Sequence, residues 1–356
     1  MIPGAARWPL LCPNQRRSLP VKRLIPLLLA LLLVLPACGR TPAEPRAITV
    51  GLALPAAGDS SRTTAEAAEG ALRALAESDG TVTLVTEEAG ESGLSSAIQS
   101  LTGRADLVLT VGESSAAALS LRARSALETH PGTTFVLLDG LGIQGENVTC
   151  YSFAMEEAAF LAGFAAARAT DTGTVGYLQG AGTDGEPCAA GFIAGVRAVS
   201  SQARILQLRP GNGTGETDAA VVDLVQKGAD VIFCAAREGK SELITACARE
   251  GVWAETVATD ESDLAESAVL AVAVKDMGFA AENAARRCAQ GTLARGSFTL
   301  DLEAGGVRLA VREGILTEKA TAALSQVTSA IESGARTVPA DLAALEELYP
   351  GAYTLN

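Results

Sequence analysis

The chain contains few residues of the types that usually carry out catalysis or stack against flat ligands. Its 356 residues include eight Phe, four Tyr, two Trp and a single histidine, His130. Sugars and nucleobases are commonly held against aromatic rings, and few rings are present here. His130 precedes a proline in a segment typical of a turn, and no Gly-x-Ser-x-Gly motif or paired carboxylates accompany it. The sequence therefore argues against a hydrolytic triad, and we do not expect an enzyme.

Positive charge is also scarce. The 28 Lys and Arg residues are outnumbered by 41 Asp and Glu residues, which gives a formal net charge of −13 at pH 7. A polyanion of this size is repelled by phosphate backbones and by anionic lipid surfaces. We therefore expect no nucleic-acid partner.

Paired cysteine motifs are lacking as well. Beyond position 38 the chain has five cysteines, an odd number that leaves at least one thiol unpaired, and their spacing matches no zinc-binding pattern. We expect neither a metal nor a cofactor. We interpret the cysteines as small buried apolar residues, with one or two disulfides as the alternative. The five are Cys150, Cys188, Cys234, Cys247 and Cys288.

The N-terminal segment has the pattern of a bacterial lipoprotein signal peptide over residues 1–37. A basic cluster at 16–23 precedes an apolar run from Leu24, which ends in Leu35-Pro36-Ala37-Cys38. The run is too short to span about 30 Å of hydrocarbon. We predict that Cys38 is lipidated and anchors the chain at the extracytoplasmic face of the cell membrane, with 38–46 as a tether. Removing 1–37 takes away five basic residues and no acidic ones, so the formal charge falls from −13 to −18.

Apolar runs of strand length alternate with longer Ala-rich amphipathic stretches after the tether. Continuous apolar strands are typical of parallel sheets covered on both faces, so the pattern predicts an α/β fold with doubly wound sheets. The length of the mature chain suggests two lobes. The expected strands are 48–54, 82–86, 107–111, 135–139, 174–178, 204–208, 231–235, 256–259 and 271–274, and the expected helices are 65–77, 156–169, 188–199, 218–227, 241–251 and 280–291.

Polar or small residues follow these strands repeatedly, and in open α/β sheets ligands bind beyond the carboxyl ends of the strands. Lys275 ends an apolar run, where its charge must reach solvent, a ligand or the carboxylate of a structural ion pair. The expected ligand-binding residues are Asp59, Ser60, Thr64, Gly112, Glu113, Asp139, Phe153, Gly182, Asp184, Arg237, Asp260 and Lys275.

One Gly-rich segment requires a separate test. Gly180, Gly182 and Gly185 form a GxGxxG motif between an expected strand and an expected helix, which is the context of a dinucleotide site. However, we expect Glu186-Pro187 to separate the glycines from the helix, and the next strand ends without an acidic ribose ligand. A ligand-cleft loop is the favoured interpretation, and a dinucleotide-binding enzyme is the alternative.

Several segments resemble the basic-membrane-protein (BMP) family of PnrA-like lipoproteins. They are NVTCYSFAMEEAAFLAGFAAA at 147–167, TDTGTVG at 170–176, GFIAGVR at 191–197, KGADVIF at 227–233, ATDESD at 258–263 and AVAVK at 271–275. The resemblance covers roughly 48–312. Members of this family are substrate-binding proteins of ABC transporters, and those characterised bind purine nucleosides. It implies a small-molecule solute and an ABC permease as partners, with a ligand-sensing receptor of the same fold as the alternative.

The resemblance further implies a type I periplasmic-binding-protein fold, in which two three-layer α/β lobes with parallel sheets close around a solute. It places the first lobe at 47–150 plus 258–297, the second at 151–257 plus 298–335, and an extension at 336–356. The crossovers would lie near 150–153, 257–260 and Phe298. By position, Asp260 resembles the family aspartate that holds ribose hydroxyls, and Lys275 resembles the family's cleft lysine. Asp139 lies where an aspartate can contact the edge of the base.

Two segments depart from the family pattern. After its first strand the family has an Asp-rich turn that ends in Asp-Lys-Ser-Phe-Asn, and its Phe stacks on the base. Here residues 55–64 contain no aromatic ring, and the second expected ring, after the 204–208 strand, is replaced by GNGTGET at 211–217. Each lost stacking contact removes about 1–3 kcal/mol. Asp59, Ser60 and Thr64 would instead hold a smaller, more polar solute.

Overall fold

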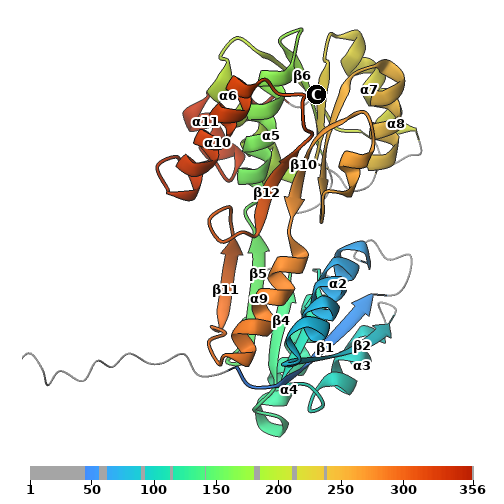
Figure 1. Ribbon diagram of the computed structural model, residues 1–356, viewed down its shortest axis with the longest axis vertical. Helices are drawn as coiled ribbons and strands as arrows, with labels where there is room; N and C mark the ends of the chain where they lie inside the picture. The colour runs from blue at the N-terminus through green and yellow to red at the C-terminus, as the bar shows by residue number, and fades with distance from the viewer. Residues whose placement is uncertain are drawn as a thin grey trace, which may run out of the picture. The chain divides into compact units, whose positions relative to one another are not determined.

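The computed structural model describes residues 45–55, 62–89, 93–112, 115–140, 142–179, 185–210, 215–235 and 239–354 (Figure 1). Residues 44–356 form one compact unit. The expected signal peptide, Cys38 and most of the tether lie outside the described residues. Among the helices that are described, none combines the length and the apolarity that a membrane span requires.

The first sheet has six parallel strands in the order β11-β5-β4-β3-β1-β2. Its central strands are buried on both faces, as their continuous apolar sequences predict. The strands are β1 (Ile48–Pro55), β2 (Val82–Ala89), β3 (Leu107–Val111), β4 (Thr134–Leu138), β5 (Val148–Phe153) and β11 (Gly296–Leu300).

The second sheet repeats this order as β12-β10-β9-β8-β6-β7. Five of its strands are parallel, and β12 runs antiparallel to β10 at the edge. The strands are β6 (Thr174–Leu178), β7 (Arg204–Leu208), β8 (Val231–Cys234), β9 (Trp253–Ala258), β10 (Val269–Lys275) and β12 (Val307–Val311).

Helices cover both faces of each sheet, so each lobe has three layers. On the first sheet, α2 (Arg62–Asp79) and α9 (Met277–Ala289) pack together on one face, and α3 (Leu94–Leu101) and α4 (Ala116–Thr129) lie on the other. On the second sheet the pairs are α5 (Met155–Ala169) with α6 (Gly185–Val199), and α7 (Glu216–Gln226) with α8 (Lys240–Glu250). Helix α10 (Glu318–Glu332) packs on α5, and α11 (Leu342–Leu348) packs on α6.

Glycines bring α5 and α6 into backbone contact. A Cβ atom added at Gly163, Gly191 or Gly195 would lie 2.0 Å from a carbonyl oxygen of the partner helix. Both helices are buried along most of their length, which agrees with their almost uniformly apolar sequences. Charges remain at the ends of α5, where Glu156 in the first turn and Arg168 in the last suit the helix dipole. The small residues of this pair are therefore required by the closeness of the two backbones.

The nine expected strands and six expected helices are all present, and the fold is that of the expected two-lobe α/β class. The resemblance misplaced one lobe boundary. Residues 258–275 were expected in the first lobe, but β10 pairs with β9 in the second sheet, so the chain returns to the first lobe only after Lys275. The physical reason is that β9 and β10 are joined by a short connection with one 3-10 turn, Ser262–Ala265, which makes them neighbours.

The other two crossovers lie within a few residues of their expected positions. Strand β5 ends at Phe153 before α5 enters the second lobe, and the chain leaves the first sheet after Leu300. Glu157 near the start of α5 connects these crossovers, because its Oε2 atom accepts a hydrogen bond from the Leu302 backbone N–H at 2.9 Å. Strands β11 and β12 were not expected.

Three smaller points are decided by the structure. All five cysteines beyond Cys38 are buried thiols that form no disulfide, which confirms the apolar interpretation. The C-terminal extension packs on the second lobe, where Leu345 of α11 is fully buried. The expected gap between the glycine motif and its helix is wrong, because α6 begins at Gly185 and includes Pro187 in its first turn. Proline is tolerated there because the first-turn N–H groups have no partner inside the helix.

Candidate functional site

Five of the expected ligand-binding residues lie within the described part of the chain: Gly112, Asp139, Phe153, Asp260 and Lys275. All five end or follow a strand of a parallel sheet, as expected. Thr64 belongs to α2, but its side chain is outside the description. The remaining expected residues, Asp59, Ser60, Glu113, Gly182, Asp184 and Arg237, lie outside the described residues.

An ion pair joins the two sheets at this site. Lys275 is the last residue of β10 in the second sheet, and Asp139 follows β4 in the first. The Lys275 Nζ atom lies 2.7 Å from Asp139 Oδ1, and the two side chains are only 5% and 16% exposed. A charged hydrogen bond of this length, shielded from water, is stronger than a surface pair. Of the possibilities considered for Lys275, the structure shows a carboxylate partner.

Phe153 completes this junction. The Lys275 Nζ atom lies 5.6 Å from the centre of the Phe153 ring, which is a cation–π distance. Phe153 is the last residue of β5, next to β4 in the sheet, and is itself buried. The structure thus brings together Asp139, Phe153 and Lys275 from three strand ends in two lobes.

The backbone at the ends of β3 and β4 is shaped for this arrangement. Asp139 has φ = +56°, the one positive φ of a non-glycine residue among those described. Its N–H donates to the Tyr151 carbonyl at 2.9 Å, which keeps it aligned with β5. The left-handed conformation costs an L-residue roughly 1–2 kcal/mol. Gly112 takes φ = +83° after β3 and donates its N–H to the Leu138 carbonyl at 2.8 Å.

Asp260 follows the end of β9, the strand that pairs with the Lys275 strand. It is exposed, and its Oδ1 atom accepts a hydrogen bond from the Ser262 N–H at 2.8 Å. Hydrogen bonds from Ser262, followed by the positive charges of Lys240 and Arg308, lower the pKa of Asp260 below its ordinary value. The carboxylate is therefore ionised at neutral pH and accessible as an acceptor.

The sequence analysis did not identify the two cations near Asp260. Lys240 begins α8, and its Nζ lies 2.9 Å from Asp263 Oδ1. Arg308 in β12 contacts Glu261 at 2.5 Å and Asp276 at 3.7 Å. Lys240 could have been found as the charged residue at the start of the helix that follows β8, whereas Arg308 belongs to an unexpected strand. These contacts connect the Asp260 loop to α8 and to the start of α9.

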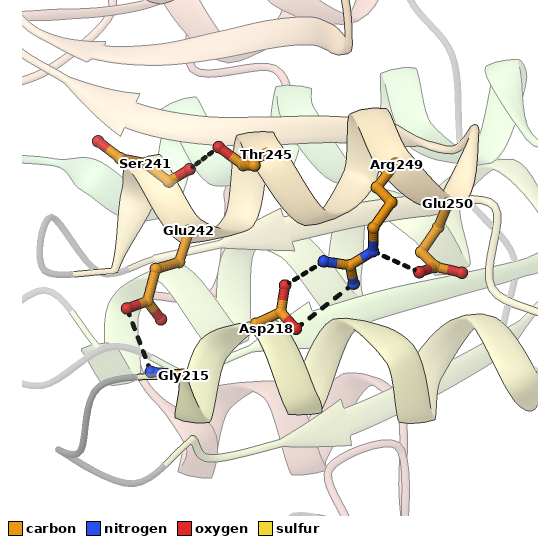
Figure 2. Close-up of polar contacts among 7 residues, drawn as sticks. All are labelled: Gly215, Asp218, Ser241, Glu242, Thr245, Arg249 and Glu250. Carbon is orange, nitrogen blue, oxygen red and sulfur yellow. Dashed lines mark hydrogen bonds and ion pairs between the residues drawn. The ribbon is translucent and has the colours of Figure 1, made fainter.

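The helices that follow β7 and β8 are held together by a polar network (Figure 2). Glu242 of α8 accepts from the Gly215 N–H at the start of α7, at 3.2 Å. Arg249 donates to both carboxylate oxygens of Asp218, at 2.7 and 3.4 Å, and to Glu250 at 3.0 Å. The network fixes α7 against α8 at the surface of the second lobe.

No described group of three His, Cys, Asp or Glu side chains is arranged to hold a metal ion. Two cavities are lined by none of the expected ligand-binding residues. One of about 490 Å³ lies along α9, and one of about 280 Å³ lies between α5, β12 and α10. The polar groups that converge from both lobes are those at the strand ends, so the candidate site is placed there.

Comparison with known proteins identifies a family. Residues 47–340 match the model of the family described as ABC transporter substrate-binding protein PnrA-like. The ABC transporter nucleoside-binding protein BmpA of Lactococcus lactis is 28% identical over 238 residues, which cover 60% of this chain and 67% of that protein. The transcriptional activator protein med of Bacillus subtilis is 30% identical over 186 residues, covering 51% of this chain and 57% of that protein.

Solved structures share the fold. A transcriptional activator of the comK gene from Bacillus halodurans has a TM-score of 0.70 at 21% identity, covering 82% of this chain and 99% of that chain. An ABC transporter solute-binding protein from Conexibacter woesei has a TM-score of 0.67 at 20% identity, covering 83% and 99%. These likenesses, together with the two sheets, give a two-lobe fold of the type I periplasmic-binding-protein kind.

Proposed function

Because this chain belongs to the PnrA-like family of ABC transporter substrate-binding proteins, we propose that it captures a small polar solute of the purine-nucleoside class and delivers it to an ABC permease. The observation that carries the proposal is the junction of Asp139, Phe153 and Lys275, which joins strand ends of both lobes. A solute held at such a junction contacts both lobes, so its binding free energy favours the closed arrangement.

The charges at the site favour a neutral solute. The Lys275 cation is already balanced by Asp139 at 2.7 Å, and the Asp260 carboxylate remains ionised and accessible. A carboxylate makes strong hydrogen bonds with hydroxyl donors and repels anions. Ribose hydroxyls fit this requirement, and BmpA of Lactococcus lactis, a relative, is named a nucleoside-binding protein. The solute therefore carries several hydroxyl groups and no negative charge.

The lipid anchor forms a separate part of the proposal. Cys38 follows a basic cluster and a short apolar run, as a lipidated first residue requires. We propose that the lipid holds the protein at the extracytoplasmic face of the cell membrane, beside its permease. The Cys38→Ser variant should then move from the membrane fraction to the soluble fraction, and equal membrane retention of both chains would contradict the anchor.

A receptor function is the second candidate. The observation that favours it is the similarity to transcriptional activators, at 30% identity in the case of Bacillus subtilis med. In this case the solute would be bound in the same way but reported to a regulatory partner. Uptake measurements separate the two: deletion of the gene should abolish import of the bound solute if the protein serves a permease, and leave import unchanged if it serves a sensor.

The direct test is binding of the purified full chain to inosine, guanosine and adenosine, alongside free bases, sugars and amino acids. A solute at 100 times its Kd adds about 2.7 kcal/mol to the free energy of unfolding, which a thermal shift detects. Asp260→Asn should weaken nucleoside binding strongly. Asp223→Asn is the matched control, because Asp223 pairs only with exposed Lys227 among the described residues. Shifts with amino acids alone, or unchanged binding by Asp260→Asn, would contradict the proposal.

A further inference from the structure

Residues 349–354, here termed the C-terminal strap, are bound to the second sheet by two glutamines. Gln207 of β7 donates from Nε2 to the Ala352 carbonyl at 2.8 Å and accepts at Oε1 from the Thr354 N–H at 3.1 Å. The Tyr353 hydroxyl donates to Gln179 Oε1 at 2.6 Å. Gln207 pairs with Tyr177 in the sheet register, two residues before Gln179, so both glutamines lie on the same face.

The strap lies at the end of the sheet where ligands are expected. Gln179 follows β6 directly and precedes the glycine motif, and α6 begins after that motif at Gly185. At the same end, Glu186 in the first turn of α6 accepts from the Leu342 N–H at 3.2 Å and so positions α11. Parallel sheets bind their ligands beyond the carboxyl ends of their strands. The Tyr353–Gln179 contact therefore belongs to the ligand-binding edge of the second lobe.

The two glutamines differ in which of their hydrogen-bonding groups are used by the strap. Gln207 uses both its amide nitrogen and its amide oxygen in hydrogen bonds to the strap. Gln179 is only 9% exposed, its Oε1 atom is used by Tyr353, and its Nε2 group donates to no group among the described residues. A carboxamide nitrogen carries two donor hydrogens, which a bound solute can accept. Gln179 therefore has donor capacity at the strand end that the described part of the protein does not use.

We propose that Gln179 is a solute-contacting residue, which donates from its amide nitrogen to an acceptor oxygen or ring nitrogen of the solute. Tyr353 is its positioning residue, because the phenol hydroxyl holds Oε1 and so sets the orientation of the amide. Carbonyl, hydroxyl and imine acceptors all occur in purine nucleosides, whereas hydrocarbon chains and ammonium groups offer no acceptor. The inference rests on the proposed function and adds a donor from the second lobe, opposite in character to the Asp260 acceptor.

The experiment measures the Kd of the nucleoside that the wild-type full chain binds most tightly, by calorimetry, together with the Tm without solute. Gln179→Leu should weaken binding about 2- to 13-fold, the usual range for one neutral hydrogen bond. Tyr353→Phe should weaken it about 2- to 5-fold, and Tyr349→Phe, a control in the same strap, should have no effect. In the Gln179→Leu background, Tyr353→Phe should cause no further loss, because a positioning residue acts only through its partner.

The outcomes separate this inference from the proposed function. Wild-type affinity in Gln179→Leu would overturn the solute contact while nucleoside binding itself stands. A lower Tm with unchanged Kd in Tyr353→Phe would reduce the strap to a structural element and overturn its positioning role. A wild-type protein that binds none of the nucleosides, bases, sugars or amino acids would overturn the proposed function, and the inference with it.

Discussion

The two lobes share one strand order, but their helices are packed by different means. On the second sheet, α5 and α6 meet at glycines whose added Cβ atoms would lie 2.0 Å from backbone carbonyls. On the first sheet, α2 and α9 meet through alanines: a Cβ at Gly278 would lie 3.2 Å from the Ala71 Cβ, and one at Gly70 would meet nothing within 4 Å. The same topology is therefore compatible with backbone contact in one lobe and with side-chain spacing in the other.

This difference indicates where each lobe tolerates change. A helix pair in backbone contact cannot move apart by a methyl group without losing many dispersion contacts at once. A pair separated by alanine side chains can adjust by small shifts. We expect the second lobe to be the more sensitive to added volume.

The largest effect is expected at the α5–α6 contact. Gly195→Ala places a methyl group against the Phe160 carbonyl, so the helices must separate or the chain must distort. We expect a loss of about 3–5 kcal/mol in the free energy of unfolding, measured by urea denaturation. Ala194→Gly, at the buried neighbouring position in the same helix, tests whether any change there has this effect. Similar losses in both variants would contradict the steric explanation.

Breaking the junction between the lobes should have the next largest effect. Lys275→Met removes the cation from a buried pair and leaves the Asp139 carboxylate with one partner fewer. We expect a loss of about 1–3 kcal/mol at pH 7. Lys227→Met removes a lysine from an exposed pair with Asp223 and should cost at most about 0.5 kcal/mol. Equal losses in the two lysine variants would show that the junction contributes no more than a surface pair.

The second sheet also contains a buried acid that the first sheet lacks at the equivalent strand. Glu255 in β9 is fully buried with both carboxyl oxygens unpaired, whereas β4 has the uncharged sequence TFVLL. Burial raises the pKa of Glu255 well above its ordinary value, so the folded state retains a proton that the unfolded state loses. Stability therefore falls as pH rises above about 4.5, by at most about 1.4 kcal/mol per pH unit.

Glu255→Gln removes this titration. Relative to the wild type, the variant should gain stability steadily between pH 4.5 and 8, as measured by urea denaturation at each pH. A stability difference that is constant over this range would show that Glu255 is ionised in the folded protein.

The smallest effect is expected in the first lobe and has the opposite sign. Gly70→Ala adds a methyl group to an exposed position of α2 where nothing lies within 4 Å. Alanine has the higher helix propensity, so the variant should gain about 0.5–1 kcal/mol. Destabilisation in thermal unfolding would mean that the first lobe is as tightly constrained as the second.

Sequence patterns predicted the interior of the fold better than its edges. Central strands such as β3 and β4 are buried on both faces, and their continuous apolar runs are recognisable without a structure. The missed strand β11 is an edge strand with the sequence GSFTL and four exposed residues, which gives no such run. In β12 the charged Arg308 interrupts the apolar pattern. An edge strand is recognised by its pairing with the next strand, and this pairing depends on the tertiary fold.

The site was predictable as a set of positions and not as a set of contacts. Asp139 and Lys275 were each identified because polar residues end their strands, but they lie 136 residues apart and their pairing depends on how the two sheets meet. The burial of Glu255 could not be predicted from the sequence, because one acidic residue within an apolar strand resembles the apolar–polar alternation of a strand with one exposed face. Gln179 and Tyr353 were not linked, since their contact depends on the path of the C-terminal strap.

The interleaving of the chain between the lobes has a consequence for the order in which they fold. Strand β5 gains its outer neighbour, β11, only from residues 296–300, and α2 gains its partner from residues 277–289. The second sheet likewise receives its last strand from residues 307–311. Contacts so distant in sequence form slowly, because a long loop must close before any of them is made. During synthesis the first sheet therefore cannot be completed before residue 300 is available, and the second sheet cannot be completed before residue 311.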